Sequence, residues 1–155
     1  MAGASVLRRP EPRALPCPAM LLAAVGDDAY NVMLIVHLLA VIVAFGSLFT
    51  LSGLRRATPE AATRLYLRWV LPATVVIWVA GMGLVGMSDD LFEMTDTWVA
   101  GSLFVWLVLI ALGVFVMRPA LKQGEAGSPR VAMATGVSHL LLVVALYLMV
   151  FKPGL

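Results

Sequence analysis

Two histidines, His37 and His139, are the side chains with which this chain could do chemistry in an apolar environment. They are the only residues within four long apolar runs that titrate near neutral pH. A polar side chain in a bilayer is costly unless it is paired or bound, so each histidine is a candidate functional residue. Neutral imidazole is a standard axial ligand of haem iron, and a helix bundle can hold a haem between its helices.

The neighbours of each histidine predict which way it faces. Ala40 lies one turn from His37 on the same helical face, and Thr135 lies one turn from His139. Small residues on these faces favour close helix contacts, so both histidines are expected to point into a bundle. They then either bind haem b or serve as polar links that donate hydrogen bonds between helices. At 1.5 Å per residue their depths differ by about 10 Å, so one haem per histidine, or a haem with another second ligand, fits no worse than a shared haem.

Soft sulfur ligands suggest a second chemistry. Met33 and His37 are spaced i, i+4 on one face, and Met82 falls at about the same depth on the next apolar run. Thioether and imidazole groups together suit copper(I), so Met33, His37 and Met82 form a candidate metal site. The alternative is that methionine fills irregular apolar space. In the same way, Trp78 and Trp106 either flank a cofactor or provide bulk packing.

The length of the apolar runs predicts the fold that positions these residues. The chain has 155 residues, of which 61% are apolar and 13% are charged. About 20 apolar residues cross the hydrocarbon core of a bilayer, and four runs qualify, at 32–54, 69–87, 98–117 and 131–151. We expect an all-α polytopic membrane protein, an up-down bundle of four transmembrane helices over residues 30–155. Residues 1–29, which are rich in proline, are expected to be a disordered tail.

Prolines and glycines suggest where these helices begin, bend and end. Thr58-Pro59 fits a helix start, and Pro72 predicts a kink inside the second span. Tyr66 is expected among the aromatic residues at the membrane interface. The glycines between residues 81 and 86 favour close packing or a local distortion, and Arg118-Pro119 is expected to end the third helix.

The distribution of charge predicts the orientation in the membrane. The segments 55–68 and 118–130 are basic, whereas the segment between the second and third runs is acidic. The basic residues are Arg55, Arg56, Arg64, Arg68, Arg118, Lys122 and Arg130, and the acidic residues are Asp89, Asp90, Glu93 and Asp96. Basic short loops remain in the cytoplasm, so both termini are expected outside the plasma membrane. The net charge of +2 is thus read as a topology signal and not as a nucleic-acid site.

Several functional classes have no support in the sequence. No carboxylate or basic residue lies in the middle of a run to relay protons. No hydrolase, protease or nucleotide-binding motif occurs, so we expect no catalytic residues and a non-enzymatic role. The single cysteine, Cys17, cannot form an intramolecular disulfide. The class that competes with haem or copper binding is a structural or assembly subunit of a membrane complex, which associates with other membrane subunits or with itself.

Three short stretches carry a family resemblance. They run from His37 to Phe49, from Arg118 to Leu121, and from Tyr147 to the Lys152-Pro153-Gly154 ending. Over residues 30–155 the chain resembles a bacterial family of predicted integral membrane proteins, domain of unknown function 2269. It is more distantly similar to CopD-type copper resistance proteins and to HemJ-type protoporphyrinogen oxidases. HemJ-type proteins are haem-associated, and the resemblance implies that His37 corresponds to their first-span histidine, in a role in electron transfer or tetrapyrrole handling.

Overall fold

The computed structural model describes residues 27–88 and 91–153, and every regular element in these two ranges is a helix. Most of the predicted tail, Cys17 included, lies outside the described residues. In chain order the elements are α1 (Asp28–Ala57), α2 (Pro59–Leu65), the π-helical turn η2 (Tyr66–Val70), α3 (Leu71–Gly86), α4 (Thr97–Ala111), the π-helical turn η3 (Leu112–Met117), α5 (Arg118–Lys122), the 3₁₀ turn η4 (Gly124–Gly127) and α6 (Ser128–Phe151).

These elements join into long helices. Within the described residues, four helices are long and apolar enough to cross a membrane, at Asp28–Ala57, Pro59–Gly86, Thr97–Lys122 and Gly124–Phe151. The all-helical class and the number of long apolar helices are therefore confirmed. Each helix extends beyond the apolar run from which it was predicted, because polar residues at the ends of a run continue the helix into the surface region.

The expectation that Arg118-Pro119 ends the third helix is wrong, because the helix continues to Lys122. Proline has no N–H, and its ring collides with the carbonyl four residues earlier in a regular α-helix. Here the turn before the proline widens, and the backbone N–H of Arg118 donates to the carbonyl of Gly113, five residues earlier. Pro72 is accommodated in the same way, because the N–H of Leu71 donates to the carbonyl of Tyr66. The predicted distortion at Pro72 is thus a π-helical turn.

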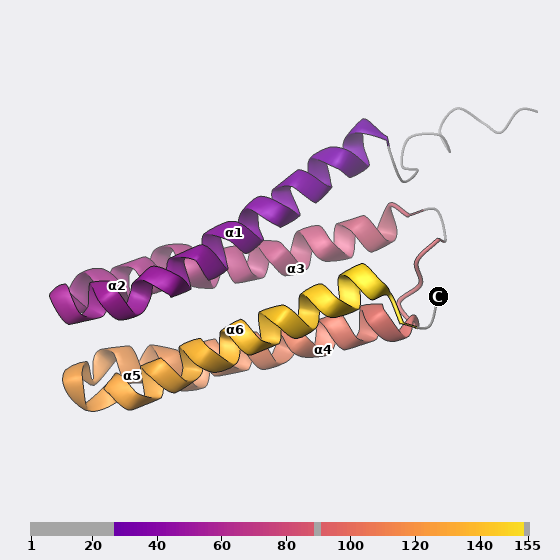
Figure 1. The fold of residues 1–155 in the computed structure, drawn as a ribbon. Helices are drawn as coiled ribbons and strands as arrows, with labels where there is room; N and C mark the ends of the chain where they lie inside the picture. Colours follow the sequence, from indigo (N-terminus) through magenta and orange to yellow (C-terminus); the bar gives the residue numbers. More distant parts are fainter. Residues whose placement is uncertain (1–26, 89–90, 154–155) are drawn as a thin grey trace, which may run out of the picture.

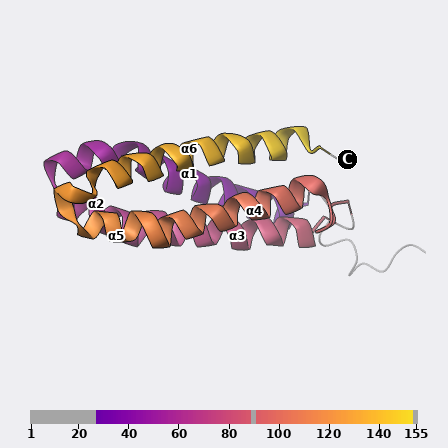
Figure 2. The same cartoon turned by 90° about the horizontal axis from the view of Figure 1, so that it is seen from below.

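The long helices form two packed pairs, α1 with α3 and α4 with α6 (Figure 1). In the view from below, α6 overlaps α1 and α4 overlaps α3, because one pair lies behind the other (Figure 2). The connections near α2 and α5 lie at one end of the molecule, which we call the basic end because it carries Arg55 and Arg118. The C-terminus and the connection between α3 and α4 lie at the opposite end, which we call the terminal end (Figure 1). Consecutive long helices therefore run in opposite directions.

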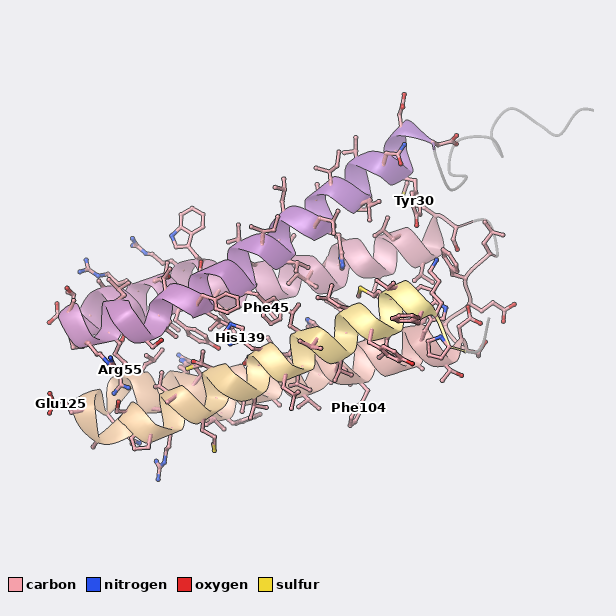
Figure 3. The ribbon with its side chains drawn as sticks, viewed as in Figure 1. Tyr30, Phe45, Arg55, Phe104, Glu125 and His139 are labelled. Carbon is pink, nitrogen blue, oxygen red and sulfur yellow. The ribbon has the colours of Figure 1, made fainter. Side chains whose placement is uncertain are left out.

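The best-packed part of the interior is the half of the bundle nearer the basic end. Leu51, Met117 and Ala134 are at most 1% exposed there and belong to one continuous apolar cluster. The outside is also apolar: Phe104 is 66% exposed and points away from the helices (Figure 3). A helix that is apolar all round needs an apolar environment on its outer side as well. The less densely packed half, toward the terminal end, contains the cavities described below.

Tyr66 faces the interior of the bundle and not its outer surface. Its side chain is only 4% exposed and belongs to the core. Its hydroxyl faces Gly113 of η3: a Cβ atom added to Gly113 would lie 2.5 Å from the Tyr66 oxygen. The two π-helical turns therefore contact each other, and the absent side chain at position 113 makes room for the phenol.

This contact gives a stability prediction. Gly113→Ala should destabilise the protein by about 1–3 kcal/mol, because the new methyl group overlaps the Tyr66 hydroxyl. Tyr66→Phe removes the hydroxyl, so most of this loss should disappear in the double variant. The free energies of unfolding of the four proteins in detergent micelles give the coupling energy. Gly53→Ala is the control, since a Cβ atom there meets nothing within 4 Å; equal losses for Gly113→Ala with and without Tyr66→Phe would contradict the prediction.

Candidate functional site

His37 lies between α1 and α3, where it is 5% exposed. Its ring nitrogen Nδ1 lies 3.0 Å from the carbonyl oxygen of Ile77 on α3. A carbonyl can only accept, so Nδ1 carries the proton and donates it in this bond. In the neutral ring Nε2 then has the free lone pair, and it has no hydrogen-bond partner among the described residues. Histidines that bind metals commonly have this arrangement, one nitrogen held by a backbone carbonyl and the other turned to the metal.

Gly81 allows the His37 ring to approach α3 this closely. A Cβ atom at Gly81 would lie 3.3 Å from Cε1 of His37 and 3.5 Å from Nδ1. Any larger side chain would push the ring away from the carbonyl of Ile77, one turn earlier on the same helix. The glycines of this region were predicted to favour close packing, and at Gly81 the group that packs closely is the His37 ring.

Two neighbouring cavities meet at His37. One has a volume of about 90 Å³ and the other of about 60 Å³, and His37, Ile77, Trp106 and Met149 line both. Both are smaller than the range of about 300–1,000 Å³ that small-molecule and cofactor sites occupy, so a ligand as large as haem would have to move the lining helices apart or extend beyond the cavity. All four long helices contribute to the lining. The cavities lie toward the terminal end, where the bundle is less densely packed than at the basic end.

Three tryptophans make the first cavity strongly aromatic. Trp78 and Trp106 stack with ring centroids 5.3 Å apart and an interplanar angle of 22°, and both line the cavity together with Trp98. The indole N–H of Trp106 donates to the carbonyl of Thr74 at 2.8 Å, which holds the stacked pair in place. Such a lining suits a flat, largely apolar ligand, and His37 supplies a polar atom that could fix its orientation.

His139 lies elsewhere. It is half-buried and packs on Phe49 of α1, with ring centroids 4.0 Å apart. Its Nε2 is buried and has no hydrogen-bond partner in the described part of the chain, and it lines neither cavity. Phe49 follows His37 by 12 residues on α1, or about 18 Å along the axis. The two histidines therefore cannot both bond to one iron, and they are separate candidates.

The three residues of the predicted copper site are only partly brought together. Met82 lines the first cavity with His37, and so does Met149 of α6. Met33 lies one turn away, against α3, where a Cβ atom at Gly83 would be 3.5 Å from its sulfur. No group of three or more His, Cys, Asp or Glu residues that could hold a metal occurs within residues 27–88 and 91–153. The soft ligands that line a cavity together with His37 are thus Met82 and Met149.

Some residues of this site were not predictable from the sequence. The carbonyl of Ile77 is a backbone atom, which no residue type reveals. Trp98 is the first residue of the third predicted apolar run, and it is 9% exposed, lines the cavity, and has an indole N–H without a partner among the described residues. The outer position of Met149 was predictable from the topology, but its convergence with His37 depends on how α6 packs.

Comparison of the chain with family models, curated proteins and solved structures finds no significant match. The resemblance to the family of unknown function and to the CopD-type and HemJ-type proteins therefore stays a prediction.

Proposed function

We propose that this chain is a small integral membrane protein that holds a haem b at His37 and serves electron transfer or tetrapyrrole handling. One observation carries the proposal: Nδ1 of His37 is held by the carbonyl of Ile77, while the same ring lines a tryptophan-rich cavity. Haem supplies an iron that changes its oxidation state at a potential set by its ligands and surroundings. In this chain His37 would supply a nitrogen ligand to the iron, and the stacked Trp78 and Trp106 would pack against the flat ring and exclude water.

The membrane placement is part of the proposal. The four apolar helices would cross the plasma membrane as an up-down bundle with both termini outside. Both basic segments lie at the same end of the molecule, which supports the charge argument for a cytoplasmic basic end (Figure 1). The cavities at His37 then open in the outer half of the bilayer. His139 remains a second, weaker candidate ligand, because it lines neither cavity.

The direct test is the optical spectrum of the protein purified in detergent from haem-replete cells. We expect a Soret band and b-type peaks after reduction. Copper(I) handling is a second candidate, because Met82 and Met149 line the cavity of His37 and thioethers favour this ion. A colourless protein that contains copper by elemental analysis would favour copper, and one that contains neither haem nor copper would favour the structural or assembly subunit.

Gly81 provides a finer test of the haem site. Gly81→Val should weaken haem binding by about 10–100-fold, the usual cost of losing a hydrogen bond to a ligating histidine. The added side chain moves the ring off the carbonyl of Ile77 while His37 itself is still present. Titration with haem, followed at the Soret band, measures the effect. Gly86→Val is the matched control on the same helix, since a Cβ atom there meets nothing within 4 Å; equal affinities for the two variants would contradict the role given to Gly81.

A further inference from the structure

A second, polar cleft lies at the basic end, far from His37. It has a volume of about 420 Å³ and lies between the α1–α2 connection and the start of α6. We call it the basic-end cleft, and five of its lining residues are polar or charged. These are Ser52, Arg55 and Arg56 from one side and Glu125 and Ser128 from the other. Figure 3 labels Arg55 and Glu125 at this end of the bundle.

Arg55 is held across the cleft by a contact between the two helix pairs. Its guanidinium donates to the carbonyl of Gly124. Gly124 has a φ of +59°, in the left-handed region that favours glycine, and this backbone geometry forms the turn whose carbonyl Arg55 reaches. A guanidinium carries five N–H donors, so most of its donors are left for another acceptor. The cation is thereby positioned in advance, which lowers the entropy lost when a ligand binds.

The other polar groups of the cleft are also available. The hydroxyls of Ser52 and Ser128 have no hydrogen-bond partner among the described residues, and Arg56 has no carboxylate partner there. Two guanidinium groups and two hydroxyls match a phosphate, which guanidinium binds in a bidentate manner. Glu125 alone would repel an anion, but it would accept a hydrogen bond from an ammonium group beside the phosphate. The set as a whole is therefore complementary to a group that carries both charges.

We propose that the basic-end cleft binds the headgroup of a membrane phospholipid that carries a phosphate and a primary ammonium, such as ethanolamine. Arg55 and Arg56 hold the phosphate, with hydrogen bonds from the serine hydroxyls, and Glu125 receives the ammonium. Basic pockets between helices at the cytoplasmic surface are where phospholipid headgroups bind membrane proteins. This inference rests on the membrane placement in the proposed function and does not depend on haem.

The test is lipid binding by native mass spectrometry of the detergent-purified full chain. Wild type, Arg56→Gln, Glu125→Gln and Arg64→Gln are each titrated with phosphatidylethanolamine and with phosphatidylglycerol. We expect wild type to prefer phosphatidylethanolamine. Arg56→Gln should weaken the binding of both lipids by about tenfold, the scale of a hydrogen bond to a charged group, whereas Glu125→Gln should lose only the preference. Arg64→Gln is the matched control, because Arg64 is exposed at the same end but does not line the cleft.

Each other outcome overturns the inference. Equal lipid binding by Arg56→Gln and Arg64→Gln would refute the phosphate site. An unchanged preference of Glu125→Gln for phosphatidylethanolamine would refute the ammonium contact. Displacement of the lipid by excess inorganic phosphate would show that the cleft takes a free anion. The lipid result and the haem result are independent of each other. A protein without haem can still bind phosphatidylethanolamine at this cleft, and a haem-loaded protein can fail to bind it. A chain that is soluble without detergent would instead refute the membrane placement.

Discussion

His37→Ala is expected to abolish the haem spectrum of the purified protein. Removal of a partner that only orients a ligating histidine costs about 10–100-fold in affinity, so removal of the ligand itself should cost more than about 100-fold. The helix should tolerate the change, because alanine is the best helix former and already occupies Ala40 and Ala44 on the same buried face. The measurement is the Soret absorbance per protein after purification, together with the affinity for added haem.

His139→Ala is the matched control for this experiment. It removes the same side chain from a position that lines neither cavity, so the spectrum should not change. Nε2 of His139 has no hydrogen-bond partner among the described residues, so the loss of stability should come mainly from its packing on Phe49. A normal spectrum in His37→Ala, or a loss confined to His139→Ala, would refute His37 as the ligand.

The largest effect on stability is expected for Gly127→Ala at the turn between α5 and α6. A Cβ atom there would overlap the carbonyl oxygen of Ala120 and lie 2.8 Å from its carbon. These are backbone atoms, so no side-chain rotation can relieve the contact, and the turn itself must open. We expect a loss of at least about 2 kcal/mol in the free energy of unfolding, in the upper part of the range for overpacking. Unfolding of the micelle-bound protein by added SDS, followed by circular dichroism, measures it.

Gly136→Ala on α6 is the control for the turn variant. A Cβ atom at Gly136 meets nothing within 4 Å, so this change should be neutral or stabilise the helix by up to about 1 kcal/mol. Gly127→Ala should also weaken the basic-end cleft, since Arg55 donates to the carbonyl of Gly124 in the same turn. Equal stability of the two variants would mean that the α5–α6 turn relaxes freely around the new methyl group.

The sequence alone determined the helical class and the number of long helices. Apolar runs of about 20 residues without internal charge satisfy their own backbone only as helices when they lie in an apolar environment. Short connections then bring successive helices together. Residue types alone also predicted the helix start at Pro59 and the close helix packing around Gly81. Proline restricts the backbone and glycine frees it, wherever they occur in the chain.

The third helix continues through Pro119, although the local sequence predicts that it ends there. In isolation, Arg118-Pro119 is a helix terminator, because proline removes a hydrogen bond and crowds the preceding turn. In the structure the widened turn Leu112–Met117 absorbs the proline, and Gly113 in that turn faces the hydroxyl of Tyr66 from another helix. The widened turn therefore packs against a residue more than 40 positions away in the sequence, a contact that the Arg118-Pro119 pair by itself does not reveal.

Only the tertiary structure distinguished the two histidines. By residue type and by small neighbours on the same face, His37 and His139 are equivalent. The difference is what each ring meets across the interface, a carbonyl beside Gly81 for His37 and the ring of Phe49 for His139. That depends on the rotation and height of each helix against its neighbour, which side-chain packing sets over the whole interface. The sequence therefore determined which residues could act, and the packing of the helices decided that one of them faces a cavity.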